Sequence, residues 1–476
     1  MTELTPCWIA LPFFMGFVIY LFPKLDRYLA VGVALATVGY ALLLFGQPEP
    51  LTWQFLDNFG VSLQADNLSA YFILTNGLVT AAVCAYCWSQ GKSAFFYTQM
   101  MMLHGSVNAI FICYDLISVY IALEVIGIAA FLLIAYPRTN RSIWVALRYL
   151  FVSNTAMLFY LVGAILVFQY QQSFDFSSLE QAPAEAIALL CLGLLAKGGI
   201  FISGLWLPLT HSESESPVSA MLSGVVVTTG VFPLLRMANI VPEIDLVVRV
   251  FGLATALFGV IYAILEKDTK RMLAFSTISQ LGFIMAAPIA AGFYALAHGL
   301  AKSALFLSVG ALPSRKFAEL AQTTIHRTLW IAIALAGLSL SGIPLIGGFA
   351  AKTYTLKNLT SWQEIGMNIA AVGTACVFAK LIFLKPGNSP KQLSIGFWLG
   401  VGGLIGGLLL ANGLYYDLYS LETVLKALGK LALGWIVYWV LIRRTALELP
   451  KAGERLENLI GTMTLAIVII FWMVVA

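Results

Sequence analysis

The sequence predicts an all-α polytopic membrane protein. Of the 476 residues, 60% are hydrophobic and only 11% are charged, whereas soluble domains carry about 25% charged residues. Apolar runs recur along the whole chain, and many reach the roughly 20 residues that a membrane-spanning helix needs. Because no low-complexity stretch or linker separates these runs, we expect a single membrane domain.

About 14 to 16 spanning helices are expected from these runs. The count depends on the long run 328–360, which we interpret as one helix broken in the middle. The segments are expected near residues 7–22, 28–46, 66–88, 95–113, 115–136, 143–169, 186–205, 217–239, 245–265, 272–290, 292–313, 328–360, 366–384, 395–413, 420–441 and 456–475.

Two of these segments contain residues that interrupt helices. Gly198 and Gly199 follow a lysine within 186–205, and 328–360 is interrupted by Gly342, Pro344, Gly347 and Gly348. Paired broken helices in corresponding positions are typical of transporters built from inverted repeats. Each break falls in the fourth helix of a five-helix set. We therefore predict two inverted repeats, 95–239 and 245–384, flanked by further spanning helices in 1–94 and 385–476.

The charges of the loops predict the orientation of the chain. With the N-terminus outside, the odd-numbered connections hold nearly all basic loop residues, as the positive-inside rule requires. Both termini are then expected on the non-cytoplasmic side of an energy-transducing membrane. The basic residues are Lys24, Arg27, Lys92, Arg138, Arg141, Lys267, Lys270, Arg271, Arg315, Lys316, Arg327, Lys385, Lys391, Arg443, Arg444, Lys451 and Arg455; Glu49, Asp57, Asp66, Asp115, Asp175, Glu180 and Glu185 lie in the opposite loops.

Composition and motifs also exclude several classes of function. No basic patch with interleaved aromatic residues indicates a nucleic-acid partner. No G-x-G-x-x-G motif or cysteine cluster predicts a cofactor or a metal, and Cys84 and Cys87 are interpreted as helix-packing residues in an apolar run. No cleavable signal peptide is evident, so the first apolar run is interpreted as a retained span. The expected partners are the lipid bilayer, neighbouring membrane proteins and small ions.

Several ionisable residues are predicted to lie deep in the membrane. Glu124, Lys197 and Lys302 are mid-span, His298 is one helical turn before Lys302, and Lys352 follows the second break. An ionisable group near the bilayer centre costs at least about 2.5–3.5 kcal/mol and indicates function. Burial makes a lysine release its proton more readily and a nearby carboxylate favours its charged form, so a Glu–Lys pair can bind and release protons. Glu124 is therefore the expected partner of Lys197.

Other readings of the polar residues remain open. Arg148, about two turns into its helix, either belongs to this set or extends to the cytoplasmic edge. His298 can also be a packing residue. Lys426 and Lys430, one turn apart in a late helix, are expected on a solvated face.

Four stretches of the sequence resemble the antiporter-like subunits of respiratory complex I, its photosynthetic relatives and the Mrp cation/proton antiporters. They are LEVIGIAAFLLIAY around Glu124, LLAKGGIFISGLWLPLTHSESESPVSAMLSGVVVTTGVFPLLR at 194–236, EKDTKRMLAFSTISQLGF at 266–283, and HGLAKSALFL with the downstream SLSGIPLIGGFAAKTYTLKN. The resemblance covers the middle two-thirds of the chain.

The resemblance implies roles for individual residues. Glu124 matches the glutamate of the family's fifth helix and Lys197 matches its lysine partner in the broken seventh helix. His298 and Lys302 match the central relay. Lys352 matches the terminal charged residue, which leads to the outer half-channel. Arg148 matches a basic residue near the glutamate.

Two positions depart from the family pattern. Where many D-type members carry a lysine, this chain has Thr228, so the link between Lys197 and Lys302 is expected to run through water, Thr228, Thr229 or Ser223. The second departure is the loop HSESES, which holds His211, Glu213 and Glu215. Its carboxylates either attract cations at the inner mouth or form a solvated turn.

The resemblance implies a secondary transporter subunit of the Mrp D type rather than an enzyme. It would exchange Na⁺ or K⁺ for protons through a Glu/Lys/His relay, within a hetero-oligomer of sister membrane subunits. The alternative is a proton-translocating subunit of a complex I-like NAD(P)H or ferredoxin:quinone oxidoreductase, whose redox groups lie on partners. A third reading is a scaffold that has lost transport.

Overall fold

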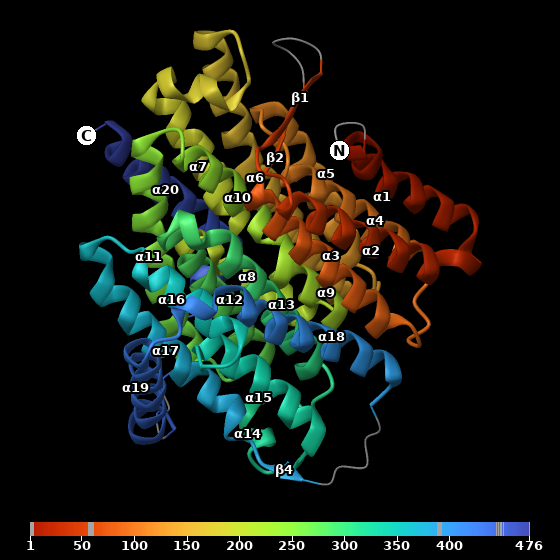
Figure 1. The fold of residues 1–476 in the computed structure, drawn as a ribbon, viewed down its shortest axis with the longest axis vertical. Helices are drawn as coiled ribbons and strands as arrows, with labels where there is room; N and C mark the ends of the chain where they lie inside the picture. Colours follow the sequence, from red (N-terminus) through yellow and green to blue (C-terminus); the bar gives the residue numbers. More distant parts are fainter. Residues whose placement is uncertain are drawn as a thin grey trace.

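The protein is an all-α bundle of long helices packed side by side (Figure 1). The computed structural model describes residues 4–55, 61–387, 393–443, 445, 447, 450 and 452–475. The longer helices are α1 (Leu4–Leu21), α2 (Asp26–Phe45), α3 (Asn67–Cys87), α4 (Ala94–Ile110), α5 (Leu116–Ile134), α6 (Asn140–Gln171), α7 (Ala184–Gly198), α10 (Thr228–Ala238), α11 (Pro242–Leu265), α12 (Thr269–Ala286), α13 (Ala291–Val309), α15 (Arg327–Ser341), α16 (Gly347–Lys357), α17 (Glu364–Ile382), α18 (Ile395–Asn412), α19 (Leu421–Val437) and α20 (Leu456–Val475); the short helices include α8 (Leu207–Glu213), α9 (Ser216–Met221) and α14 (Phe317–Leu320).

The predicted spans correspond to these helices. In the described part of the chain, 13 helical segments are long and apolar enough to cross a membrane. Three expected spans are not among the 13, namely α4, α12 and the broken pair α15–α16. All three pack inside the bundle against other helices, so the predicted all-α polytopic membrane fold is confirmed.

Both predicted helix breaks are present. Helix α7 ends at Gly199, whose φ is +70°, and α15 ends at Gly342, whose φ is +86°. Glycine adopts this left-handed conformation without the steric cost that a side chain brings. After the first break the chain forms a 3₁₀ turn, Phe201–Trp206, before α8. The two breaks free backbone carbonyls at the ends of α7 and α15 inside the bundle.

A short β-hairpin, which the sequence did not predict, joins α2 to α3. Strands β1 (Leu51–Phe55) and β2 (Val61–Ala65) pair antiparallel, with Leu51 opposite Ala65. Two further strands, β3 (Ile325–His326) and β4 (Pro386–Gly387), form a two-residue parallel pair. Four loop residues used to predict orientation, Asp57, Lys391, Arg444 and Lys451, lie outside the described residues.

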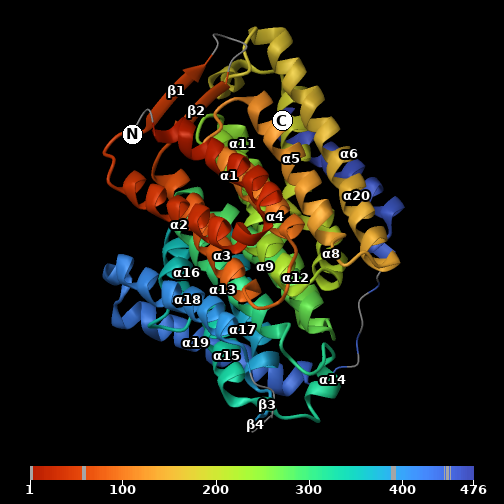
Figure 2. The ribbon, with the colours of Figure 1, turned by 90° about the vertical axis from the view of Figure 1, so that its right-hand side faces the viewer.

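The centre of the bundle is α13. Every residue of α13 and of α10 is buried, and α13 contacts α3, α9, α12, α15, α16 and α18. The two helices at the C-terminal end lie on different sides of the bundle: α19 packs beside α17, whereas α20 packs beside α7 and α6 (Figures 1 and 2). The order of helices allows the two five-helix sets, but their inverted relation stays a prediction.

A buried ion pair ties α10 to the start of α3. Arg236 Nη1 and Nη2 donate to the Asp66 carboxylate at 2.6 and 3.0 Å, and Nη2 also donates to Ser69 Oγ at 2.7 Å. Asp66 in turn caps α3 by accepting from the Ser69 amide. Burial opposes ionisation of Asp66, but the Arg236 guanidinium and the Ser69 donors hold its pKa below the usual value.

Replacing Asp66 by asparagine tests this ion pair. Asn retains the helix cap but leaves the Arg236 charge buried without a counterion, which costs about 3–5 kcal/mol. We expect D66N to lower the free energy of unfolding in detergent by about that amount. Because the pKa of Asp66 is depressed, the contribution of its charge is present above about pH 4 and is lost as the pH falls below it. The control D245N, which affects the more exposed Arg249–Asp245 pair, is expected to cost less than about 1 kcal/mol.

Candidate functional site

Lys197 lies at the first helix break and is almost completely buried. It occupies the last turn of α7, where the helix dipole favours a cation. Its Nζ donates to Leu123 O of α5 at 2.9 Å and to Ser153 Oγ of α6 at 2.5 Å. A Cβ added at Gly127 of α5 would lie only 3.2 Å from Nζ. The ammonium therefore fits a pocket between α5 and α6.

The expected Glu124–Lys197 pair is not a direct contact. Glu124 lies next to Leu123 on α5 and is half-buried, and its Oε1 is buried without a hydrogen-bond partner. Among the described residues, Glu124 forms no ion pair. The structure places the two groups on neighbouring helices, but the Lys197 ammonium uses a carbonyl and a hydroxyl instead.

His298 and Lys302 lie at the centre of the bundle. Both are fully buried on α13. Lys302 Nζ donates to Leu273 O of α12 at 3.0 Å and lies 5.4 Å from the centre of the Phe378 ring. His298 Nε2 lies 3.3 Å from Ser223 O, whereas its Nδ1 has no partner among the described residues. The two side chains thus contact different helices.

A buried hydrogen-bond chain lies between these two residues, and its links to His298 and Lys302 are the backbone carbonyls of Ser223 and Leu273, which accept but do not pass on a proton. Ser223 lies in a π-helical segment, Leu222–Val226, between α9 and α10. Its Oγ lies 2.7 Å from Thr277 Oγ1 of α12, and Thr277 donates to Leu273 O at 2.9 Å, the same carbonyl that accepts from Lys302. The sequence prediction missed Thr277. The polar run Ser276–Gln280 inside an apolar span was the available signal.

Thr228 and Thr229 do not join this chain. Their hydroxyls donate to Val225 O at 2.7 Å and to Val226 O at 2.6 Å, in the preceding turn of their own helix. Thr228 therefore satisfies the local carbonyl that the π-helical segment frees. The described side chains leave no continuous hydrogen-bond path from Lys197 to Lys302.

Helix α12 continues the polar line from Lys302 toward Lys352. Past Thr277, Gln280 Oε1 accepts from Tyr294 OH at 2.6 Å. Further along α12, the Phe283 ring lies 4.9 Å from Lys352 Nζ. Leu273 and Phe283 are ten residues apart, which is about 15 Å along a helix. Lys302 and Lys352 therefore lie toward opposite ends of α12.

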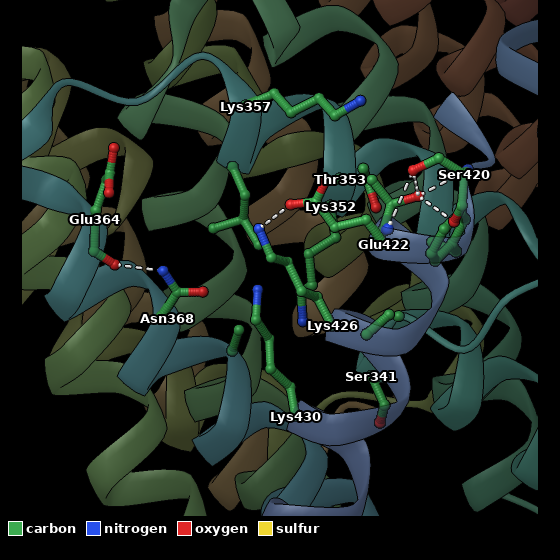
Figure 3. Close-up of a pocket in the computed structure, with 16 residues that line it drawn as sticks. Ser341, Lys352, Thr353, Lys357, Glu364, Asn368, Ser420, Glu422, Lys426 and Lys430 are labelled. Atoms are coloured by element: carbon green, nitrogen blue, oxygen red, sulfur yellow. Dashed lines mark hydrogen bonds and ion pairs between the residues drawn. The ribbon is translucent and has the colours of Figure 1, made fainter. Parts of the chain in front are cut away.

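Lys352 lies at the second break and opens onto a cavity. Its Nζ donates at 2.8 Å to Leu340 O, in the last turn of α15, and the residue is 5% exposed. The cavity has a volume of about 610 Å³ and is bordered by α16, α17 and α19 (Figure 3). The Lys352 ammonium thus lies against the carbonyl end of the broken helix α15, whereas Lys197 lies at a break but binds groups of α5 and α6.

Arg148 lies against the C-terminal segment. Its guanidinium donates to Glu454 O and lies 5.9 Å from the Trp144 ring. The Glu454 carboxylate binds Arg271 of α12, with Nη2 to Oε1 at 2.5 Å. Arg148 is buried, so the structure favours neither simple extension to the membrane edge nor a contact with Glu124.

The two carboxylates of the HSESES segment form ion pairs, one with the loop before α4 and one with the first turn of α6. Glu215 accepts from Lys92 at 2.7 Å, and Glu213 lies 3.6 Å from Arg141. His211 is fully buried between the Trp206 and Phe306 rings, and neither ring nitrogen has a partner in the described part of the chain. The paired carboxylates support a structural role for this loop.

The sequence model of a known family matches this part of the chain. Residues 113–378 match the family described as "NADH:quinone oxidoreductase/Mrp antiporter, TM". The chain belongs to this family. The match contains Glu124, Lys197, Lys302 and Lys352, whereas α19 and α20 lie outside it.

Curated relatives include both antiporter and redox proteins. The chain is 28% identical to Hydrogenase-4 component B of Escherichia coli K12, over 64% of this chain and 52% of that protein. It is 26% identical to the D-type subunit of the Na(+)/H(+) antiporter of Alkalihalophilus pseudofirmus, over 77% and 82%. It is also 26% identical to NAD(P)H-quinone oxidoreductase chain 4 1 of Synechococcus sp. JA-2-3B'a(2-13), over 79% of each. The chain thus spans about half of the first relative and most of the other two.

Two solved structures share the fold. A chain of the Mrp complex from Dietzia sp. DQ12-45-1b has a TM-score of 0.81 and 23% identity, with 97% of this chain and 59% of that chain covered. A chain of the archaeal membrane-bound sulfane sulfur reductase has a TM-score of 0.77 and 19% identity, with 92% and 100% covered. The family and the fold together establish an antiporter-type integral membrane protein.

Replacing Gly127 by alanine tests the Lys197 pocket. The added methyl group would lie 3.2 Å from Nζ and 3.3 Å from Ser153 Oγ, so both groups have to shift by a few tenths of an ångström and their hydrogen bond is weakened. We expect the melting temperature in detergent to fall. The control is Gly402→Ala in α18, where an added Cβ meets nothing within 4 Å; alanine there is expected to be neutral or to stabilise the helix by up to about 1 kcal/mol. Equal melting of both variants would contradict the close fit at Gly127.

Proposed function

We propose that this chain is the ion-translocating subunit of a multisubunit antiporter that exchanges Na⁺ or K⁺ for protons. The supporting observation is that Lys197, Lys302 and Lys352 are each bound through backbone carbonyls. None of the three contacts a carboxylate in the described residues. A buried ammonium without a counterion is costly, so each lysine can take up and release a proton at moderate cost.

The proposed proton path has two parts. On one side, Glu124 and Lys197 exchange a proton across the α5–α7 contact. On the other, Lys302, the Thr277–Ser223 pair and Lys352 follow α12 to the cavity beside α19. Water is required between Lys197 and Lys302, because Thr228 and Thr229 donate within their own helix. Transfer of one charge across 100 mV is worth about 2.3 kcal/mol, which allows the membrane potential to drive exchange. In this proposal both termini face the non-cytoplasmic side.

The exposed face of α5 supports assembly with a sister subunit. Glu124 is half-buried, and Ile121 and Ile128, on either side of it, are 56% and 52% exposed. A carboxylate that faces lipid near the bilayer centre costs several kcal/mol. A neighbouring membrane subunit that covers this face would remove that cost and would give Glu124 a partner.

A second candidate is the proton-translocating subunit of a complex I-like quinone oxidoreductase. The similarity to the Synechococcus protein favours it, and the same lysines would serve. In that case the redox groups would lie on other subunits, and proton movement would require electron transfer.

Substitution of Lys197 tests the proposed mechanism. In everted vesicles that contain the complete complex, we expect K197A to reduce cation-dependent proton flux at least tenfold, because alanine cannot hold the proton that Lys197 carries in that pocket. The control K316A removes a 74% exposed loop lysine and is expected to leave the flux unchanged. Wild-type flux in K197A would contradict the relay. Flux that requires an electron donor and a quinone, rather than Na⁺ or K⁺ alone, would favour the second candidate.

Replacing Thr277 by valine tests the central connection. Valine has nearly the same shape but removes the hydroxyl that bridges Ser223 and Leu273 O, at a cost of about 1 kcal/mol. We expect a several-fold lower proton flux with a small change in melting temperature. The matched control is T155V, since Thr155 donates to Phe151 O of its own helix at an exposed site. Equal flux in both variants would remove Thr277 from the path.

A further inference from the structure

The cavity beside Lys352 contains lysines from a helix outside the family match. Lys426 and Lys430, one turn apart on α19, border it together with Lys352 of α16. Figure 3 shows the three side chains extending toward the same part of the cavity. The expectation that Lys426 and Lys430 lie on a simple solvated face is therefore incomplete, because both face the terminal lysine of the proposed path.

Lys430 lies well inside the apolar span Leu421–Ile442. It is nine residues after Leu421, the first residue of α19, which corresponds to about 14 Å along a helix. The hydrocarbon core is about 30 Å thick, so a spanning α19 is expected to place Lys430 near its middle. An ionisable group at that depth is costly, which indicates a function for Lys430 as it does for Lys197 and Lys302. Lys430 is half-buried, and the described residues give it no hydrogen bond or ion pair.

Neither described carboxylate that borders the cavity is paired with Lys352 or Lys430. Glu422 binds Lys426 at 2.5 Å, which neutralises that lysine near the mouth. Glu364 of α17 caps the opposite side, and Lys357 of α16 adds a further positive charge. Among the described residues, Lys352 and Lys430 are thus the two cations in the interior of the cavity without a carboxylate contact.

Two such groups do not hold protons independently. Like charges that share a partly dehydrated site disfavour one another, so a proton on one promotes release from the other. A cavity of about 610 Å³ has ample room for the waters that would carry a proton between them. Lys352 and Lys430 are therefore expected to bind protons as a pair, in which the protonation of one lysine affects that of the other.

We propose that Lys430 is a second proton-carrying residue, which passes protons between Lys352 and the solvent at the cavity mouth. An N–H bond of the Lys352 ammonium breaks, water in the cavity carries the proton, and the neutral amine of Lys430 takes it up. Lys430 then releases the proton to solvent past the Lys426–Glu422 pair. The inference rests on the proposed proton movement through Lys352 and gives α19 a role in it.

Substitutions at Lys430 test this inference in everted vesicles that contain the complete complex. We expect K430A to lower proton flux about tenfold. Lys430→Arg should not restore it, because a guanidinium keeps the positive charge but does not release its proton. Added methylamine, which is small enough to enter the cavity, should restore flux to K430A and should leave K430R unchanged. The control Gly429→Ala, in open space on the same helix, is expected to behave as wild type.

The outcomes separate this inference from the proposed function. Full flux in K430A or in K430R, while K197A is inactive, would overturn the role of Lys430 and leave the antiporter proposal intact. Full flux in both K430A and K197A would overturn the proposed path itself. Complex assembly and melting temperature are measured for each variant; a K430A complex that assembles and melts like wild type but does not respond to methylamine would assign Lys430 an electrostatic role only and overturn the relay.

Discussion

The energetic cost of a charge in low dielectric is the constraint on which the rest of the structure depends. A buried ammonium needs acceptors, and a membrane interior offers few that are not already used within helices. The protein meets this need in two ways: Lys197 and Lys302 act as second donors to carbonyls of the continuous helices α5 and α12, and Lys352 binds a carbonyl at the break after α15. Each break frees carbonyls at a helix end, and these ends carry partial negative charge. Lys352 uses such a carbonyl, Leu340 O at the end of α15, whereas Lys197 lies in the last turn of α7 and reaches acceptors on α5 and α6.

This constraint explains why much of the architecture could be predicted from the sequence. Long apolar runs predict the helices, and the glycines at 199 and 342 mark the breaks because only glycine adopts their backbone conformation cheaply. The lysines next to the breaks could be identified because no structural role requires a charge there. The hairpin β1–β2 was missed, since its ten strand residues form two short runs in the connection between two strong helical signals.

Contacts between helices could not be predicted in the same way. The sequence made Glu124 the partner of Lys197, since it is the one mid-span carboxylate that the predicted spans contain. Whether an ammonium reaches a carboxylate or a carbonyl depends, however, on the rotation of α5 and on the space at Gly127. Thr277 was missed for a related reason. Its partner Ser223 lies in a π-helical segment, and no local sequence pattern predicts the change in helix register that this segment brings. Lys430 was assigned to solvent because the packing of α19 against α17 was unknown.

The segment before α20 ties the two halves of the molecule together. Glu454 accepts from Arg148 of α6 through its carbonyl and from Arg271 of α12 through its carboxylate, so one short stretch of chain is anchored to both predicted repeats. Any sliding of one repeat against the other has to stretch or exchange these bonds. The C-terminal segment therefore works as a tether between α6 and α12 at the rim of the bundle.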